Sequence, residues 1–214
     1  NKKSVLWYVL NSFKRYFISD TFIFIIPSDK SIEKFITEVC IELKIVDYRF
    51  KQLNFDTDGQ ASTVYNALDI MPDEELIIFN IDTFRPNYVK SEIMLRSDGY
   101  LECFLGEGDA WSFVLGDIKN NTVTLTTEKK RVSDYCSTGL YYFKNAGIFM
   151  EAYMLATKNK ALSLGEYFIA PIYNQILDKH HVSFELIDIN DVIFCGVPSE
   201  YERLCNSITH SAPN

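Results

Sequence analysis

The sequence lacks several features that would place the protein in particular classes. Its five cysteines form no C-x-x-C pair and lie in apolar segments, which predicts reduced, buried thiols instead of a disulfide framework. No apolar run comes near the roughly 20 residues that cross a bilayer, and no signal peptide is recognisable. Basic residues are in deficit, with 21 Lys and Arg against 29 Asp and Glu. We therefore expect a cytoplasmic protein without membrane insertion and without general affinity for nucleic acid.

Length and composition predict one folded domain. The 214 residues are 47% hydrophobic and 14% aromatic, which is enough to bury a large core. The net charge of −8 does not exclude phosphate ligands, because one lysine and a metal ion can reverse the sign locally. The sequence contains no internal repeat and no linker rich in Gly, Pro or Ser, so we predict a single domain over residues 1–214.

The first half of the chain alternates helices with strands. Apolar residues at helical spacing predict a helix over 4–17 and a second helix that Ser28, Asp29 or Ser31 caps. A glycine turn at Gly59 leads into a third helix. Such alternation is typical of a parallel α/β sheet. The predicted strands are 21–26, 45–55 and 76–79.

The second half has a different pattern, with several strands joined by short turns before the next helix begins. We interpret it as a mixed extension built onto the first sheet, without a second core of its own. The predicted strands are 99–105, 111–115, 121–127, 135–143, 182–187 and 191–197, and the predicted helices are 146–158, 165–179 and one that begins at Pro198.

A carboxylate follows the most apolar strand of the first half. Four apolar residues, Leu76 to Phe79, indicate a strand buried on both faces, as in a parallel sheet, and Asn80-Ile81-Asp82 comes directly after it. Ligands bind at the carboxyl edge of open α/β sheets. A carboxylate there can hold a divalent cation that bridges a polyphosphate. Taken alone, Asp82 fits a turn cap better, so its role depends on the rest of the chain.

Five segments occur in an order that is typical of one enzyme family. They are Thr57-Asp-Gly-Gln-Ala61, Asn80-Ile-Asp82, Thr127-Glu-Lys-Lys130, Ser133-Asp-Tyr-Cys-Ser-Thr-Gly-Leu-Tyr-Tyr-Phe143 and Cys195-Gly-Val-Pro-Ser199. Over essentially its whole length the chain resembles the sugar-phosphate nucleotidyltransferases of the nucleotide-diphospho-sugar transferase superfamily. The Thr-Gly-Leu-Tyr strand is the most specific match, and the whole pattern is most similar to a branch associated with bacterial capsule biosynthesis.

The resemblance implies a fold and a reaction. The fold is a Rossmann-like, mixed but mainly parallel α/β sheet with helices on both faces, in which 1–98 form a nucleotide-binding half and 99–214 a sugar or acceptor half. The enzyme would join a nucleoside triphosphate to a sugar-1-phosphate or similar phosphomonoester and release pyrophosphate, for capsule or surface polysaccharide biosynthesis. An oligomer is compatible with the pattern.

The resemblance also implies roles for individual residues. Asp82 would hold Mg²⁺, and Lys129 would meet the acceptor phosphate, so both would act in catalysis. Because the substrate brings its own nucleophile, no activated serine or cysteine is needed. The nucleotide would be bound by Gly59, Gln60 and Asn80, and the acceptor by Glu128, Lys129, Thr138, Gly139 and Trp111.

The sequence departs from the family pattern in two places. The family opens with a strand and a glycine-rich phosphate loop, whereas this sequence starts in what resembles the following segment. Because a sheet without its central strand would leave unpaired edges, we expect residues preceding Asn1 in the intact protein to supply both. The family also carries a metal-binding aspartate where this chain has Phe194, which cannot be a ligand. Asp188 and Asp191 lie nearby in sequence but not at the matching position.

Simpler interpretations and other functions stay open at this point. Gly59 fits an ordinary turn before a helix, Glu128 and Lys129 fit an exposed ion pair, and Trp111 fits a core residue as well as a sugar platform. A metal-dependent glycosyltransferase of the same fold is a second function, against which the absence of an Asp-x-Asp pair counts. A non-catalytic nucleotide- or sugar-binding domain is a third, which the missing loop and Phe194 would fit.

Overall fold

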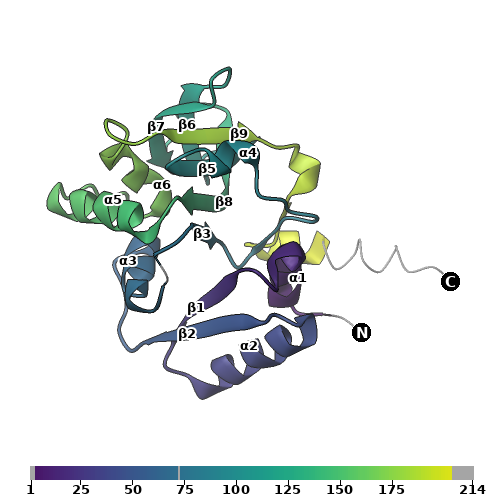
Figure 1. Cartoon of the computed structure of the whole chain (residues 1–214). Helices are drawn as coiled ribbons and strands as arrows, with labels where there is room; N and C mark the ends of the chain where they lie inside the picture. The colour runs from purple at the N-terminus through teal and green to yellow at the C-terminus, as the bar shows by residue number, and fades with distance from the viewer. Residues whose placement is uncertain (1–2, 72, 204–214) are drawn as a thin grey trace.

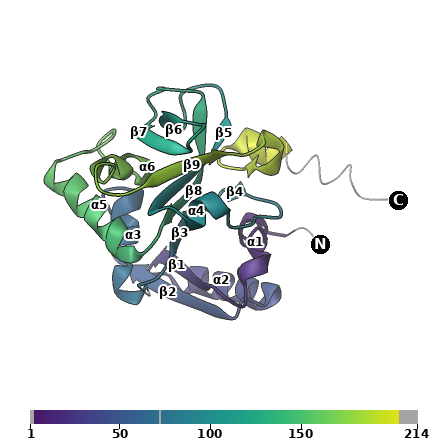
Figure 2. The same ribbon diagram turned by 45° about the horizontal axis from the view of Figure 1, so that its top comes forward.

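The structure, a computed structural model, describes residues 3–71 and 73–203. Its described residues contain a six-stranded sheet, the two-stranded sheet of β1 and β2, called the small sheet below, and a two-stranded ladder of β4 and β10. Figures 1 and 2 show the small sheet beside β3 (Leu76–Phe79), the first strand in the order of the large sheet. Because Asn80 and Asp82 follow β3, the predicted site lies where the two sheets meet.

The small sheet is a parallel β–α–β unit. β1 (Thr21–Pro27) and β2 (Asp47–Leu53) pair in parallel, and α2 (Lys30–Leu43) connects them. Asp29 caps this helix, as predicted, because its carboxylate accepts a hydrogen bond from the backbone N–H of Ser31 at 2.7 Å. The apolar side chains of this unit and of the N-terminal helix form a small core of their own.

The large sheet has the strand order β3-β8-β5-β9-β7-β6. β6 also pairs with β8 between Phe113 and Cys136, so the sheet curls toward closure. β6 and β7 follow each other in sequence through a short turn and pair antiparallel, as hairpin strands do. The mixed α/β class is confirmed, but in the described part of this sheet β5 pairs in parallel with β9 alone, so a mainly parallel sheet is not confirmed. The strands are β5 (Gly99–Leu105), β6 (Ser112–Asp117), β7 (Thr122–Glu128), β8 (Tyr135–Phe143) and β9 (Val182–Leu186).

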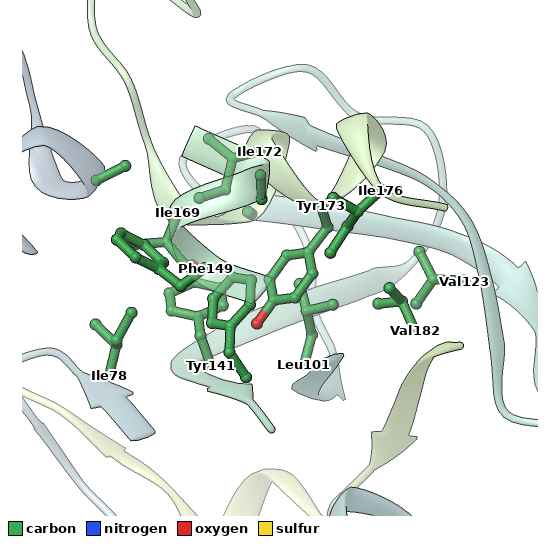
Figure 3. Packing of buried hydrophobic residues seen from close by; sticks show 14 of the residues in the cluster. Ile78, Leu101, Val123, Tyr141, Phe149, Ile169, Ile172, Tyr173, Ile176 and Val182 are labelled. Atoms are coloured by element: carbon green, nitrogen blue, oxygen red, sulfur yellow. The ribbon is translucent and has the colours of Figure 1, made fainter. Parts of the chain in front are cut away.

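The main core lies between the large sheet and the helices α5 (Ala146–Lys158) and α6 (Ile169–Ile172). Figure 3 shows the ring of Tyr173 among the side chains of this core. The Tyr173 hydroxyl donates to the carbonyl oxygens of Tyr100 and Tyr142 at 3.1 and 2.8 Å, so this buried polar group is satisfied. The second half of the chain contributes most of this core, contrary to the expectation that it only extends the first sheet.

β3, the strand that precedes Asn80 and Asp82, is also placed differently from what the sequence predicts. β3 pairs antiparallel with β8 and is half-buried over most of its length, with Ile78 as its buried residue. The expectation of a parallel strand buried on both faces is therefore wrong. The reason is that β3 stands at the end of the strand order of its sheet, where one edge faces the small sheet.

The predicted N-terminal helix ends early because of a tertiary contact. In place of a helix over 4–17, α1 (Val5–Asn11) is followed by a 3-10 turn at Lys14–Tyr16. The Ser12 hydroxyl oxygen accepts a hydrogen bond from the backbone N–H of Arg85 at 2.9 Å and so ties the helix end to a distant segment. Sequence periodicity does not reveal such a contact.

The other predicted elements are present, two of them in shortened form. Residues 165–179 contain only α6 and a 3-10 turn at Tyr173–Gln175, and residues 191–197 contain only a two-residue strand.

The described helices include none long and apolar enough to cross a membrane. Cys40, Cys103 and Cys136 are buried free thiols, as predicted, whereas Cys205 lies outside the described residues. The remaining elements are α3 (Gln60–Tyr65), β4 (Thr83–Phe84), α4 (Glu92–Leu95), β10 (Ile193–Phe194), the 3-10 turns Leu68–Ile70 and Ile189–Asp191, and helical residues 198–203.

Candidate active site

The loop before α3 is held against a second loop. Gly59 adopts a φ of 108°, a conformation that favours glycine. A Cβ at Gly59 would lie 2.8 Å from the backbone N and O of Tyr167. Ala61 N–H donates to Tyr167 O at 2.8 Å, and Tyr167 N–H donates to Asp58 O at 2.7 Å. Gly59 therefore does more than supply a turn, because its missing side chain lets the two loops touch.

Three predicted site residues meet at the end of β3. Gln60 Nε2 donates to Asn80 Oδ1 at 2.8 Å. Gly139 has a φ of 86°, and a Cβ there would lie 2.4 Å from Asn80 Nδ2. The residue sits in a bulge of β8, where three residues oppose the single residue Glu102 of β5. The bulge lets the Asn80 amide lie directly over the Gly139 backbone.

Asp82 lies beside the turn that precedes the last described helix. Its backbone carbonyl accepts a hydrogen bond from Cys195 N–H at 2.8 Å. Gly196 faces its carboxylate so closely that a Cβ would lie 2.8 Å from Asp82 Oδ2. The Glu200 carboxylate accepts hydrogen bonds from the backbone N–H groups of Gly196 and Val197 at 2.9 and 3.3 Å. Two half-buried carboxylates thus approach this glycine.

Glu128 ends β7 and Lys129 directly follows it, and the two side chains have different environments. The half-buried Glu128 carboxylate accepts a hydrogen bond from the Ser112 hydroxyl, which also lies 3.3 Å from the hydroxyl of Tyr141. Burial raises the pKa of Glu128 above its ordinary value, against the opposing effects of Ser112 and Lys129. Lys129 is exposed, with Nζ 5.6 Å from the ring centroid of Phe168. Among the described residues the two side chains form no ion pair with each other.

Trp111 belongs to a small aromatic group next to Lys129. The Lys129 N–H donates to Trp111 O at 2.9 Å. The Trp111 ring packs against Phe104 and Phe194, with centroids 5.1 and 4.8 Å apart, and its Nε1–H donates to Glu107 O at 2.9 Å. Trp111 is half-buried, so it is part of the edge of this cluster and not of its centre.

Thr138 points to a buried ion pair that the sequence does not reveal. Its hydroxyl lies 3.0 Å from Glu102 Oε1, and Glu102 forms a two-pronged salt bridge with Arg85, at 2.7 and 3.0 Å. Arg85 also donates to the carbonyl of Asp191. All three side chains of this network are buried. Spacing gives no signal for it, because the partners come from β5, β8 and the segment after β4.

The predicted residues therefore form connected groups around the end of β3. Gly59, Gln60, Asn80 and Gly139 form one group, Glu128 and Lys129 a second beside Ser112 and Trp111, and Asp82 a third beside Gly196. The side-chain amides of the first group can bind a nucleobase. The lysine ammonium and the glutamate carboxylate of the second group can bind an acceptor, and the aspartate carboxylate of the third can bind a metal ion. Among the described residues no cluster of three His, Cys, Asp or Glu side chains is placed to hold a metal ion.

Comparison with solved structures shows the same fold in enzymes that make nucleotide sugars. The chain aligns with the nucleoside-diphosphate-sugar pyrophosphorylase of Vibrio cholerae RC9 at a TM-score of 0.91 and 37% identity, over 96% of this chain and 88% of that one. It also matches a putative glucose-1-phosphate thymidylyltransferase from Bacillus anthracis, with a TM-score of 0.73, 14% identity, and 98% and 84% of the two chains covered. A UDP-glucose pyrophosphorylase bound to UDP-glucose matches with a TM-score of 0.76, 10% identity, and coverages of 98% and 88%.

The fold is that of the nucleotidyltransferases that act on sugar phosphates. Identity of 37% over nearly the whole chain extends the match from fold to family. The protein belongs to the sugar-phosphate nucleotidyltransferases, the nucleoside-diphosphate-sugar pyrophosphorylase family. Neither protein-family models nor curated proteins gave a match to the sequence.

Proposed function

We propose that the protein transfers a nucleotidyl group from a nucleoside triphosphate to a sugar-1-phosphate or a similar phosphomonoester and releases pyrophosphate. The observation that carries this proposal is its 37% identity, over 96% of the chain, to a nucleoside-diphosphate-sugar pyrophosphorylase. The contacts among Gln60, Asn80 and Gly139 support it, because they bring together residues that the family resemblance assigns to substrate binding.

The reaction needs positioning and charge neutralisation more than a reactive side chain. A phosphate oxygen of the acceptor attacks the α-phosphorus of the triphosphate, and pyrophosphate leaves with the electron pair of the broken P–O bond. The bound groups must lie in line, and the negative charge that develops must be balanced. In this proposal Lys129 meets the acceptor phosphate, and Glu128 accepts hydrogen bonds from acceptor hydroxyls. Gly59 lets the base approach the loop backbone, and Gln60 reads its edge.

Asp82 is the residue that we assign to Mg²⁺. Its half-buried carboxylate follows β3 and lies against the backbone of Gly196, where a Cβ would be only 2.8 Å from Oδ2. Mg²⁺ is usually bound by one or two carboxylates together with substrate phosphates and water, so the donor set fits. When bound, the ion held by Asp82 would help to balance the negative charge of the substrate phosphates.

The biological role proposed here is capsule or surface polysaccharide synthesis in the cytoplasm. The sequence pattern supports this assignment through its similarity to a capsule-associated branch. We also assign residues 1–98 to the nucleotide and 99–214 to the acceptor. The contact of Asn80 with Gly139 agrees with a site at the border of the two.

The direct test is to incubate the protein with each nucleoside triphosphate, Mg²⁺ and a panel of sugar-1-phosphates, and to measure pyrophosphate. We expect release that depends on both substrates and on Mg²⁺. Release without any phosphorylated acceptor would point to simple hydrolysis, and no release with any combination would contradict the proposal. The same mixtures, with nucleotide sugars replacing triphosphates, would identify a glycosyltransferase through free nucleoside diphosphate.

A further inference from the structure

Arg85 and Glu102 form a buried ion pair to which the proposed function gives no role. In the described part of the chain they are the only charged residues that are fully buried, with 8% and 3% of their surface exposed. The carboxylate accepts two hydrogen bonds from the guanidinium, at 2.7 and 3.0 Å. Replacing such a pair with apolar side chains is often neutral or even stabilising, because desolvation of the two charges is costly. Stability is therefore a weak explanation for this pair.

The guanidinium end of the pair holds the short ladder that follows Asp82. β4 lies between Asp82 and Arg85, and it pairs with β10 through only two residues in each strand. A ladder of this length needs support, because even an isolated two-stranded hairpin is at best marginally stable. At one end the carbonyl of Asp82 accepts the N–H of Cys195 at 2.8 Å. At the other end Arg85 donates through Nη1 to the carbonyl of Asp191, so the guanidinium closes the ladder.

The carboxylate end of the pair supports the bulge that contains Gly139. Glu102 is the single residue of β5 that faces three residues of β8, and its Oε1 accepts a hydrogen bond from the Thr138 hydroxyl at 3.0 Å. The same hydroxyl oxygen accepts the N–H of Leu140 at 3.3 Å. Both neighbours of Gly139 are thus tied, directly or through one hydroxyl, to the buried carboxylate. The backbone of Gly139 is the surface against which the Asn80 amide lies.

The ion pair therefore connects two of the three groups of the candidate site. A fork-shaped guanidinium that binds both carboxylate oxygens fixes the relative orientation of the two side chains, which a point charge does not. Displacement of the guanidinium would move the β4–β10 ladder relative to the bulge of β8. In a reaction that depends on positioning, a displacement of about 1 Å away from the reacting atoms can lower turnover roughly a hundredfold.

We propose that the pair of Arg85 and Glu102 positions the β4–β10 ladder relative to the bulge of β8, and with them the proposed metal-binding and nucleotide-binding groups. Arg85 acts on Asp82 through the ladder. Glu102 acts on Gly139 through Thr138. Both are positioning residues. This inference rests on the proposed function for the reaction that the positioning serves, but the positioning itself is a property of the backbone and can be measured without any substrate.

The decisive variant replaces both charges at once. R85M/E102L removes the ion pair without leaving one buried charge unpaired, so it should fold and should unfold in urea near the midpoint of the wild type. Amide hydrogen exchange followed by NMR then measures how firmly the two segments are held. We expect exchange that is about tenfold faster at the N–H of Cys195 and at the N–H of Leu140, and unchanged exchange in α2.

The matched control is R96M/E92L. It removes an ion pair of 2.9 Å between Arg96 and Glu92 at α4, whose side chains are 79% and 83% exposed. The control should leave the exchange of Cys195 and Leu140 unchanged, because an exposed pair fixes little.

Turnover tests the same positioning through the reaction. The kcat of R85M/E102L should fall roughly ten- to a hundredfold, with the KM of the acceptor within about twofold of the wild type. The single variants should separate the two ends of the pair. R85K keeps a charge beside Glu102 but lacks the fork, so it should raise the Mg²⁺ concentration at half-maximal rate. T138V removes a hydroxyl at nearly constant volume, so it should weaken binding of an uncleavable triphosphate analogue and leave the Mg²⁺ requirement unchanged. A merely structural role would lower stability without separating these two measurements.

Wild-type exchange at both amides in folded R85M/E102L would overturn the proposal, as would a wild-type kcat despite faster exchange. If R85M/E102L does not fold by circular dichroism, R85K takes its place and should exchange faster at Cys195 alone; wild-type exchange there would overturn the proposal. Faster exchange in the variant, with no pyrophosphate release from the wild type, would leave the positioning in place and contradict the proposed function. Pyrophosphate release by the wild type that the folded variant matches would do the reverse.

Discussion

The small sheet and the six-stranded sheet differ sharply in burial. In β8 of the large sheet eight of nine residues are buried, whereas β2 of the small sheet has no fully buried residue among seven. Apolar burial is the main favourable term in folding, so the large sheet carries most of the stability. The small sheet has a separate core of modest size.

From this contrast we infer that the part of the candidate site carried by the large sheet is the more rigid part. Gly139 and Glu128 come from β8 and β7 of the large sheet, and Asn80 and Asp82 follow its strand β3. Gly59 and Gln60 instead precede the short α3 and are held to the rest of the molecule by the backbone of Tyr167. We therefore expect changes on the large sheet to affect geometry more than changes in the loop at Gly59.

The largest effect is expected from Asp82→Asn. The amide keeps the shape of the side chain but loses the charge that would hold the metal. A loss of about 3 kcal/mol of transition-state stabilisation lowers kcat roughly a hundredfold, while the melting temperature should stay within a few degrees. Pyrophosphate release at several Mg²⁺ concentrations measures this. A wild-type rate at saturating Mg²⁺ would mean that Asp82 is a structural residue.

Gly139→Ala should be the most damaging substitution on the large sheet. An alanine there meets a left-handed φ of 86° and a Cβ position 2.4 Å from Asn80 Nδ2. Strain at positive φ costs about 1–2 kcal/mol, and the displaced Asn80 adds to it, so both stability and nucleotide affinity should fall. Gly108→Ala is the matched control, because Gly108 has a φ of 80° but nothing within 4 Å of its Cβ position.

The comparison of these two glycine variants separates strain from displacement. Urea unfolding should show a loss for both, because both force alanine into the left-handed region. Nucleotide affinity, measured by calorimetry, should fall in Gly139→Ala alone. If both variants bind nucleotide as tightly as the parent, the assignment of Asn80 to the nucleotide is wrong.

A smaller effect, confined to one substrate, is expected from the β7 end. Lys129→Ala should weaken binding of the phosphorylated acceptor by about 1.5–3 kcal/mol, roughly ten- to a hundredfold, and leave triphosphate binding nearly unchanged. The reason is that a charge-assisted contact with the acceptor phosphate is lost. Lys130→Ala, at the exposed neighbouring position, is the control. Equal losses for both substrates in Lys129→Ala would contradict the acceptor assignment.

Local signals in the sequence predicted much of the fold. The cap at Asp29, the glycine turn at Gly59 and the strands of the second half depend on neighbouring residues, and the structure contains them. The strand order of the large sheet could not be predicted in this way. β5 pairs with β9, and Gly99 faces Val182 from more than eighty positions away. Such pairings depend on the packing of the whole core.

The site was predictable where it depends on short motifs and not where it depends on strand geometry. The motifs predicted Asn80 and Asp82 directly after the strand 76–79 and Glu128 at the end of a later strand, and the structure has these positions. The motifs gave no sign that Thr138 faces the buried Glu102, because a bulge in β8 changes which side its residues face. The ring contacts of Phe194 were equally hidden, because a sequence shows that a carboxylate is missing but not that the phenylalanine packs against Phe104 and Trp111.

The smallest expected effect concerns stability and tests the environment of Glu128. Burial raises the pKa of this carboxyl in the folded protein above its ordinary value. A group with a raised folded pKa binds its proton more tightly in the folded state, so the wild-type protein gains stability from this residue as the pH falls through that pKa. Glu128→Gln cannot titrate. The variant should therefore be slightly more stable than the wild type at pH 7, with the difference shrinking as the pH is lowered toward the ordinary carboxyl pKa.

Urea unfolding of both proteins between pH 7 and pH 4 measures this difference in the free energy of unfolding, and the exposed Glu92→Gln is the control. A difference that grows as the pH falls would mean that Glu128 is stabilised in its charged form, and hence that its partners outweigh its burial.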